Sequence, residues 1–159
     1  MTIREISERL KNELLGYTYG FVHRGIRYTP KDDPEYALHF QEFYRAQEVS
    51  VSRKERIGTC IDSVLVMQAL MKEFGVPSRI YLLCQREKPH TVLTFQAEGK
   101  TVYLELTPSS SRPNYAKELI YADEAEWKEA WNKTHLISEI TDILKPGIRP
   151  QDLIRHVFS

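Results

Sequence analysis

The sequence predicts an α+β fold in which a buried helix packs on an antiparallel β-meander, with further helices flanking this core at both ends. Residues 60–74 are apolar on most sides when spaced as a helix, which is typical of a central helix. Three short apolar runs, 79–85, 90–96 and 101–107, follow as strands joined by segments short enough for hairpins. The length of 159 residues fits a single domain over residues 1–159.

The N-terminal part predicts one clear helix and several weaker elements. Apolar residues recur at helical spacing at Ile3, Ile6, Leu10, Leu14 and Leu15. Gly16 ends this first helix, and residues 17–28, which are aromatic and interrupted by glycine, fit either strand or helix. A turn at 30–34 leads into a helix that begins near Glu35. The polar and basic segment 50–57 predicts a loop.

The central helix carries its own start and stop signals. Thr59 can cap the N-terminus, and Asp62, three residues later, occupies the place of a capping-box acid. Gly75 ends the helix and Pro77 prevents its continuation. The sequence therefore places Cys60 in the first turn.

The last third of the chain is expected to be a helical extension over residues 114–159. A serine- and proline-containing loop at 109–113 separates it from the recognisable core, residues 58–108. Helices are expected around Trp127 and Trp131, over 137–144, and over 152–158 after Pro150.

Composition excludes several classes of protein. The 22 basic and 22 acidic residues give no net charge, which argues against a nucleic-acid or membrane-surface binder that works by bulk electrostatics. Two cysteines, Cys60 and Cys84, cannot form a disulfide scaffold, and the N-terminus mixes charges where a secretory signal needs an apolar run. We expect a cytoplasmic protein. Four scattered histidines lack metal-ligand spacing: His23, His39, His135 and His156.

Cys60 is the candidate nucleophile. A cysteine in the first turn of a helix faces unpaired N–H groups and the positive end of the helix dipole, and both favour the thiolate. Such a position can lower a thiol pKa from about 8.5 to roughly 3.5–7.5, above all beside an imidazolium. Asp62 opposes the effect with its negative charge, so a histidine is needed to supply the difference.

His90 and Glu105 are the expected partners of this thiol. If Glu98 and Gly99 form the tip of the second hairpin, Val92 lies opposite Glu105. Strict alternation then puts His90 and Glu105 on one face, as diagonal neighbours about 7–8 Å apart at the backbone. A nucleophile, a base and an orienting acid in this order follow the logic of a catalytic triad.

These residues resemble the transglutaminase-like superfamily. The resemblance rests on Gly58 to Asp62, on Gly75 to Arg79 at the end of the helix, on His90, and on Leu104 to Pro108. It implies a papain-like fold with Cys60 as nucleophile, His90 as general base and Glu105 in the acid position. It further implies acyl transfer at amide bonds of a peptide or protein substrate, without a metal or organic cofactor. Hydrolysis is expected rather than crosslinking.

Two departures from that family leave alternatives open. The family usually has aspartate at the position of Glu105, and often a small and an aromatic residue after its histidine, where this chain has Thr91 and Val92. One alternative is therefore a non-catalytic module that binds a peptide or partner protein in the same cleft, and another is an arylamine acyltransferase-like activity. Glu105 alone also fits the solvated side of a strand. The second oxyanion donor is unassigned, with Gln47 and Tyr28 as hypotheses.

Overall fold

The computed structural model describes residues 1–86, 88–108 and 116–158, and within them it confirms an α+β fold. The helices are α1 (Ile3–Leu14), α2 (Tyr36–Phe43), α3 (Val49–Glu55), α4 (Cys60–Phe74), α5 (Glu124–Asn132) and α6 (Pro150–Phe158). The first strands are β1 (Thr18–Tyr19), β2 (Phe21–His23), β3 (Ile26–Tyr28) and β4 (Ile57–Gly58). The remaining strands are β5 (Ser78–Gln85), β6 (Lys88–Ala97), β7 (Lys100–Glu105), β8 (Lys117–Tyr121) and β9 (Leu136–Glu139).

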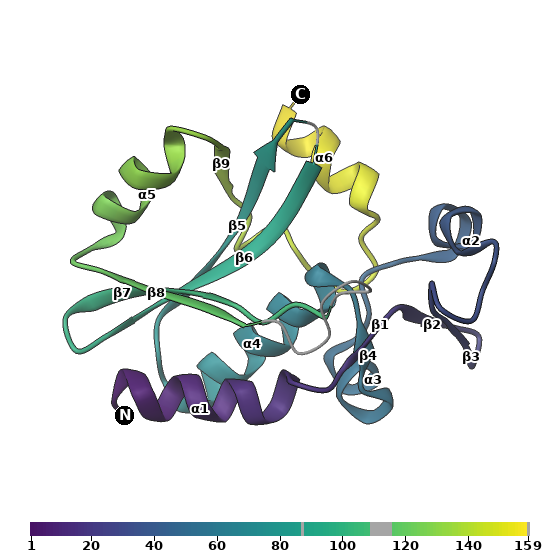
Figure 1. Ribbon diagram of the computed structural model, residues 1–159, viewed down its shortest axis with the longest axis horizontal. Helices are drawn as coiled ribbons and strands as arrows, with labels where there is room; N and C mark the ends of the chain where they lie inside the picture. Colours follow the sequence, from purple (N-terminus) through teal and green to yellow (C-terminus); the bar gives the residue numbers. More distant parts are fainter. Residues whose placement is uncertain (87, 109–115, 159) are drawn as a thin grey trace.

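A five-stranded antiparallel sheet with the order β8-β7-β6-β5-β9 forms the centre of the molecule. Helices α4 and α5 lie on opposite sides of it (Figure 1). Alternate residues of the strands belong to two clusters: Ile80 and Leu93 pack in the cluster of α4, whereas Tyr81 and Val92 pack with Trp127 of α5. Two small sheets lie upstream, β1 paired in parallel with β4 and β2 paired antiparallel with β3.

The predicted register of the second hairpin is confirmed. Leu93 pairs with Leu104, and Glu98 and Gly99 form the turn with positive φ of 53° and 70°. In the first hairpin Leu83 pairs with His90, and Cys84 with Pro89, so Cys84 and His90 point to opposite faces. Strand β6 begins at Lys88, two residues before the predicted strand.

Three predictions about the remaining elements are wrong. The helix expected over 137–144 is replaced by strand β9, because the free edge of β5 offers backbone hydrogen bonds from Tyr81 to Cys84. Strand β8 extends the sheet at the other edge, so the extension over 114–159 is not wholly helical. The segment 50–57, expected as a loop, is mostly helix α3, which buries Ser52 on its inner side. The loop expected at 109–113 lies outside the described residues.

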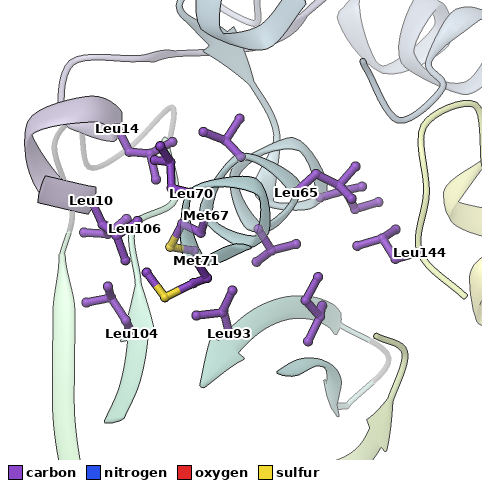
Figure 2. Packing of buried hydrophobic residues seen from close by; sticks show 14 of the residues in the cluster. Leu10, Leu14, Leu65, Met67, Leu70, Met71, Leu93, Leu104, Leu106 and Leu144 are labelled. Atoms are coloured by element: carbon purple, nitrogen blue, oxygen red, sulfur yellow. The ribbon is translucent and has the colours of Figure 1, made fainter. Parts of the chain in front are cut away.

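The main core lies between α1, α4 and one face of the sheet. Helix α4 buries most of its side chains, as its apolar pattern predicts. Figure 2 shows Met67 and Met71 of this helix between Leu10 of α1 and Leu93 and Leu104 of the strands. A helix held on two sides in this way has a fixed axis, so its N-terminus has a fixed position. In the part of the chain described, no helix is long and apolar enough to cross a membrane.

The capping box at the start of α4 is confirmed and belongs to a buried hydrogen-bond network. The Asp62 carboxylate accepts from the backbone N–H groups of Thr59 (2.9 Å) and Gln47 (2.8 Å) and from the Tyr44 hydroxyl (3.0 Å). Burial raises the pKa of Asp62 to about 6, so the group is a carboxylate at neutral pH. Gly58 makes room for it, since a Cβ there would stand 2.7 Å from the Asp62 Cβ.

Replacing Asp62 with asparagine is therefore expected to destabilise the fold. The amide nitrogen of Asp62→Asn would face a backbone N–H donor, and a buried donor left without an acceptor costs about 2 kcal/mol. Chemical denaturation should show this loss, while Glu73→Gln, at an exposed position of the same helix, should change little. Equal stability of the two variants would contradict the structural role given to Asp62.

Candidate active site

Cys60 is the first residue of α4 and remains partly exposed. The Thr59 hydroxyl accepts the backbone N–H of Ile61 at 3.2 Å, which fixes the first turn around the cysteine. N–H groups of this turn have no partner within the helix, and together with the helix dipole they stabilise a negative charge. The predicted position of the thiol at a capped helix start is thus observed.

The surroundings of Cys60 favour its thiolate. Burial raises the pKa of the thiol, but the adjacent His90 imidazole lowers it more, through hydrogen bonding and charge. Hydrogen bonding to the side chain and backbone of Thr91 lowers it further. The net effect is a pKa below the ordinary value of a cysteine. The other thiol behaves in the opposite way, because burial raises the pKa of Cys84 and no charge compensates it.

His90 lies between the thiol and Glu105. Its Nε2 atom is 2.7 Å from Oε1 of Glu105, and the two residues share a face of the sheet as the register predicts. Because Nε2 is engaged by the carboxylate, Nδ1 is the ring nitrogen left for the sulfur. The Tyr103 hydroxyl donates to Oε2 of Glu105 at 2.7 Å, so both carboxylate oxygens are held.

His90 and Glu105 each stabilise the charged form of the other. Burial lowers the pKa of His90, yet its hydrogen bonds and charge interactions with Cys60 and Glu105 outweigh burial and raise the pKa to about 10. Burial raises the pKa of Glu105, but His90, Tyr103 and Lys117 together bring it below its usual value. The side chain of Glu105 is only 14% exposed, compared with 33% for His90, so the acid is the more shielded partner. All three shifts favour the charged forms, a thiolate, an imidazolium and a carboxylate.

The three residues meet where two strands separate. The described pairing of β6 with β7 ends at Leu93 and Leu104, before the strand positions of His90 and Thr91. Cys60 interacts with both of these residues at that point. The structure thus brings the sulfur, the imidazole and the carboxylate together, from α4, β6 and β7 respectively.

Sequence reasoning missed Tyr103 and misjudged the role of Gln47. Tyr103 lies two residues before Glu105 on the same face of β7, so strand alternation would have indicated it. The Gln47 amide donates to Ser52 and to the Ile57 carbonyl, and accepts from Val22 N–H, so it supports the loop rather than the thiol. Tyr28 stacks on Phe21 with ring centroids 5.0 Å apart and lies in the upstream aromatic cluster.

A cavity of about 630 Å³ opens beside the acid–base pair, on the α5 face of the sheet. His90 and Glu105 line it together with Lys117, Tyr121 and Trp131. Cys60 is not part of its lining, so the thiol and the cavity flank the imidazole from different sides.

Among the described residues, no group of three His, Cys, Asp or Glu side chains is arranged to hold a metal ion. Comparison with models of protein families, with curated proteins and with solved structures finds no match to this chain.

The two thiols are expected to differ in their pH dependence of alkylation. Below its pKa, a thiol loses about tenfold of its thiolate for each pH unit, so alkylation of Cys84 by iodoacetamide should fall steeply between about pH 8 and pH 6. Because the pKa of Cys60 is lowered, its rate should begin to fall only at a lower pH than the rate of Cys84. Mass spectrometry of wild type, Cys60→Ala and Cys84→Ala measures each rate. Equal and slow labelling of both thiols would rule out an activated Cys60.

Removing the negative charge of Glu105 should lower the pKa of His90. An opposite charge within about 4–6 Å shifts a pKa by roughly 1–3 units, and Glu105→Gln keeps the shape of the side chain. Proton NMR of the His90 ring in wild type and variant measures the shift. Glu139→Gln, an acid on the edge strand β9, serves as the matched control. An unchanged His90 titration would mean that Glu105 does not interact with the imidazole in solution.

Proposed function

We propose that this protein is a cysteine-dependent enzyme that transfers an acyl group from an amide bond, with water as the usual acceptor. The observation that carries the proposal is the Cys60 thiol, at a helix N-terminus, with its pKa lowered by His90, which Glu105 in turn holds at 2.7 Å. A nucleophile, a base and an orienting group in one array is the arrangement that acyl transfer requires.

The proposed reaction has two steps. The Cys60 sulfur attacks the carbonyl carbon, and the electron pair of the C=O bond moves to oxygen. When this intermediate collapses, the C–N bond breaks and the His90 imidazolium gives its proton to the leaving amine, which leaves a thioester on Cys60. In the second step His90, now neutral, takes a proton from water while the water oxygen attacks the thioester, and the carboxylic acid and the thiolate are released.

Glu105 acts in this scheme as a positioning residue. Its carboxylate fixes the tautomer and the orientation of the His90 ring, and Tyr103 fixes the carboxylate. The longer side chain of glutamate, compared with aspartate, spans the diagonal between β6 and β7. The resemblance of residues 58–108 to the transglutaminase-like superfamily, with its papain-like fold, supports the same assignment.

The proposal is tested by covalent capture of the acyl group. With p-nitrophenyl acetate, wild type and Cys84→Ala should form an acetyl adduct that intact-protein mass spectrometry detects, whereas Cys60→Ala should form none. His90→Gln should slow the acylation by about 10²- to 10⁴-fold, because the imidazole contributes general acid–base catalysis. Digestion of a peptide library then identifies the amide substrates.

An added amine shows whether water or an amine accepts the acyl group from Cys60. If water is the usual acceptor, methylamine should leave the rate of deacylation nearly unchanged, and peptide products should carry free carboxylates.

The position of the cavity, which excludes Cys60, favours the second candidate, a module that binds a peptide beside His90 without chemistry. Rapid alkylation of Cys60 without any acyl adduct, together with peptide binding that survives Cys60→Ala, would favour this binding module over the enzyme.

A further inference from the structure

Acyl transfer creates a negative charge on the carbonyl oxygen, and two hydrogen-bond donors normally stabilise it. In the proposed enzyme, one donor is the Cys60 backbone N–H, which belongs to the first turn of α4. The Gln47 amide is engaged with Ser52 and Ile57 and is not available as the second donor. Another element close to the start of α4 can supply the second donor.

Strand β1 is such an element. It pairs in parallel with β4, the two-residue strand that leads directly to Thr59 and Cys60, and Tyr19 lies opposite Gly58. Two backbone hydrogen bonds hold the strands together: Thr18 N–H donates to the Arg56 carbonyl at 2.9 Å and Gly20 N–H to the Gly58 carbonyl at 3.2 Å. The backbone on both sides of Tyr19 is thus anchored to β4. Its pairing partner, Gly58, lies two residues before Cys60.

The register also sets the direction of the Tyr19 side chain. Paired residues of adjacent strands project to the same face of a sheet. On that face of Gly58 lies the first turn of α4, since a Cβ added at Gly58 would stand 2.7 Å from the Asp62 Cβ. Gly58 has no side chain to compete for this space. The Tyr19 ring also packs against the Tyr36 ring, with ring centroids 6.2 Å apart.

The electrostatic environment of Tyr19 agrees with this placement. Burial raises the pKa of the phenol, and the negative charge of the Cys60 thiolate raises it further. The hydroxyl therefore carries its proton at neutral pH and is a hydrogen-bond donor. The effect of Cys60 on the phenol indicates that the two groups are close enough to interact.

From the strand register and the packing of its ring, we infer that the Tyr19 hydroxyl is the second oxyanion donor of the reaction proposed above. When the Cys60 sulfur bonds to the carbonyl carbon, the electron pair displaced from the C=O bond makes an oxyanion between the Cys60 N–H and the Tyr19 O–H. Both donors keep their protons, and the charge returns to the C=O bond when the leaving group departs. This inference rests on the proposed function and adds a catalytic residue to it.

Two reactions of the same thiol separate this role from a structural one. Acylation by p-nitrophenyl acetate passes through an oxyanion, whereas alkylation by iodoacetamide displaces iodide at a saturated carbon and forms none. Tyr19→Phe should therefore lower the maximal rate of acylation by about 10²-fold, because loss of one oxyanion donor costs about 10²- to 10³-fold. The ester concentration that gives half of the maximal rate should not change. The rate of Cys60 alkylation should stay the same. Tyr17→Phe, a buried tyrosine two residues earlier, is the matched control and should leave both rates unchanged.

Each outcome has one meaning. Slower acylation at constant alkylation supports Tyr19 as an oxyanion donor. An equal fall in both rates would assign Tyr19 to the structure or to the pKa of the thiol and would overturn the inference, as would two unchanged rates. In these cases acylation by wild type still supports the proposed function. If wild type is alkylated rapidly at Cys60 but never acylated, the proposed function fails and the role of Tyr19 with it.

Discussion

The buried network around Asp62 is the constraint on which the site depends. A single carboxylate accepts hydrogen bonds from the cap of α4, from the backbone at Gln47 and from the Tyr44 hydroxyl, and so ties the helix start to the upstream chain. Because α4 is also held between α1 and the sheet, the position of Cys60 is set from both ends of the helix. Burial of the Cys60 thiol opposes formation of the thiolate. The His90 imidazole outweighs this burial and lowers the thiol pKa, so the residue that the helix cap holds in place depends on the sheet for its ionisation.

The register of the β6–β7 hairpin positions the other two groups, His90 and Glu105. His90 and Glu105 share a face only because the β6–β7 turn occupies Glu98 and Gly99, and a shift by one residue would send one of them to the opposite face. The end of the ladder at Leu93 and Leu104 then leaves a place where a side chain from α4 can reach His90. The site is therefore a product of three independent local features: a helix cap, a two-residue turn and a strand pairing that ends before the strands do.

These local rules explain how much could be predicted from sequence. The cap at Thr59, the stop at Gly75 and the register of the second hairpin are set by short-range signals, and the structure confirms them. Strand β9 was predicted as helix because its pairing partner, the edge of β5, is more than fifty residues away in sequence and leaves no local trace. Helix α3 was missed since its seven residues show no apolar stripe. Tyr19 was missed for a related reason: its position opposite Gly58 depends on the parallel pairing of β1 with β4, two strands of two residues each.

The central claim is that the His90 imidazolium stabilises Cys60 as a thiolate. The most direct measurement is a pH titration of thiolate ultraviolet absorbance in wild type, with Cys60→Ala subtracted as the background. The account predicts that the Cys60 thiolate signal persists to a lower pH than the thiolate of an ordinary cysteine. A signal that appears only near pH 8.5 or above, as about expected for an ordinary cysteine, would contradict it.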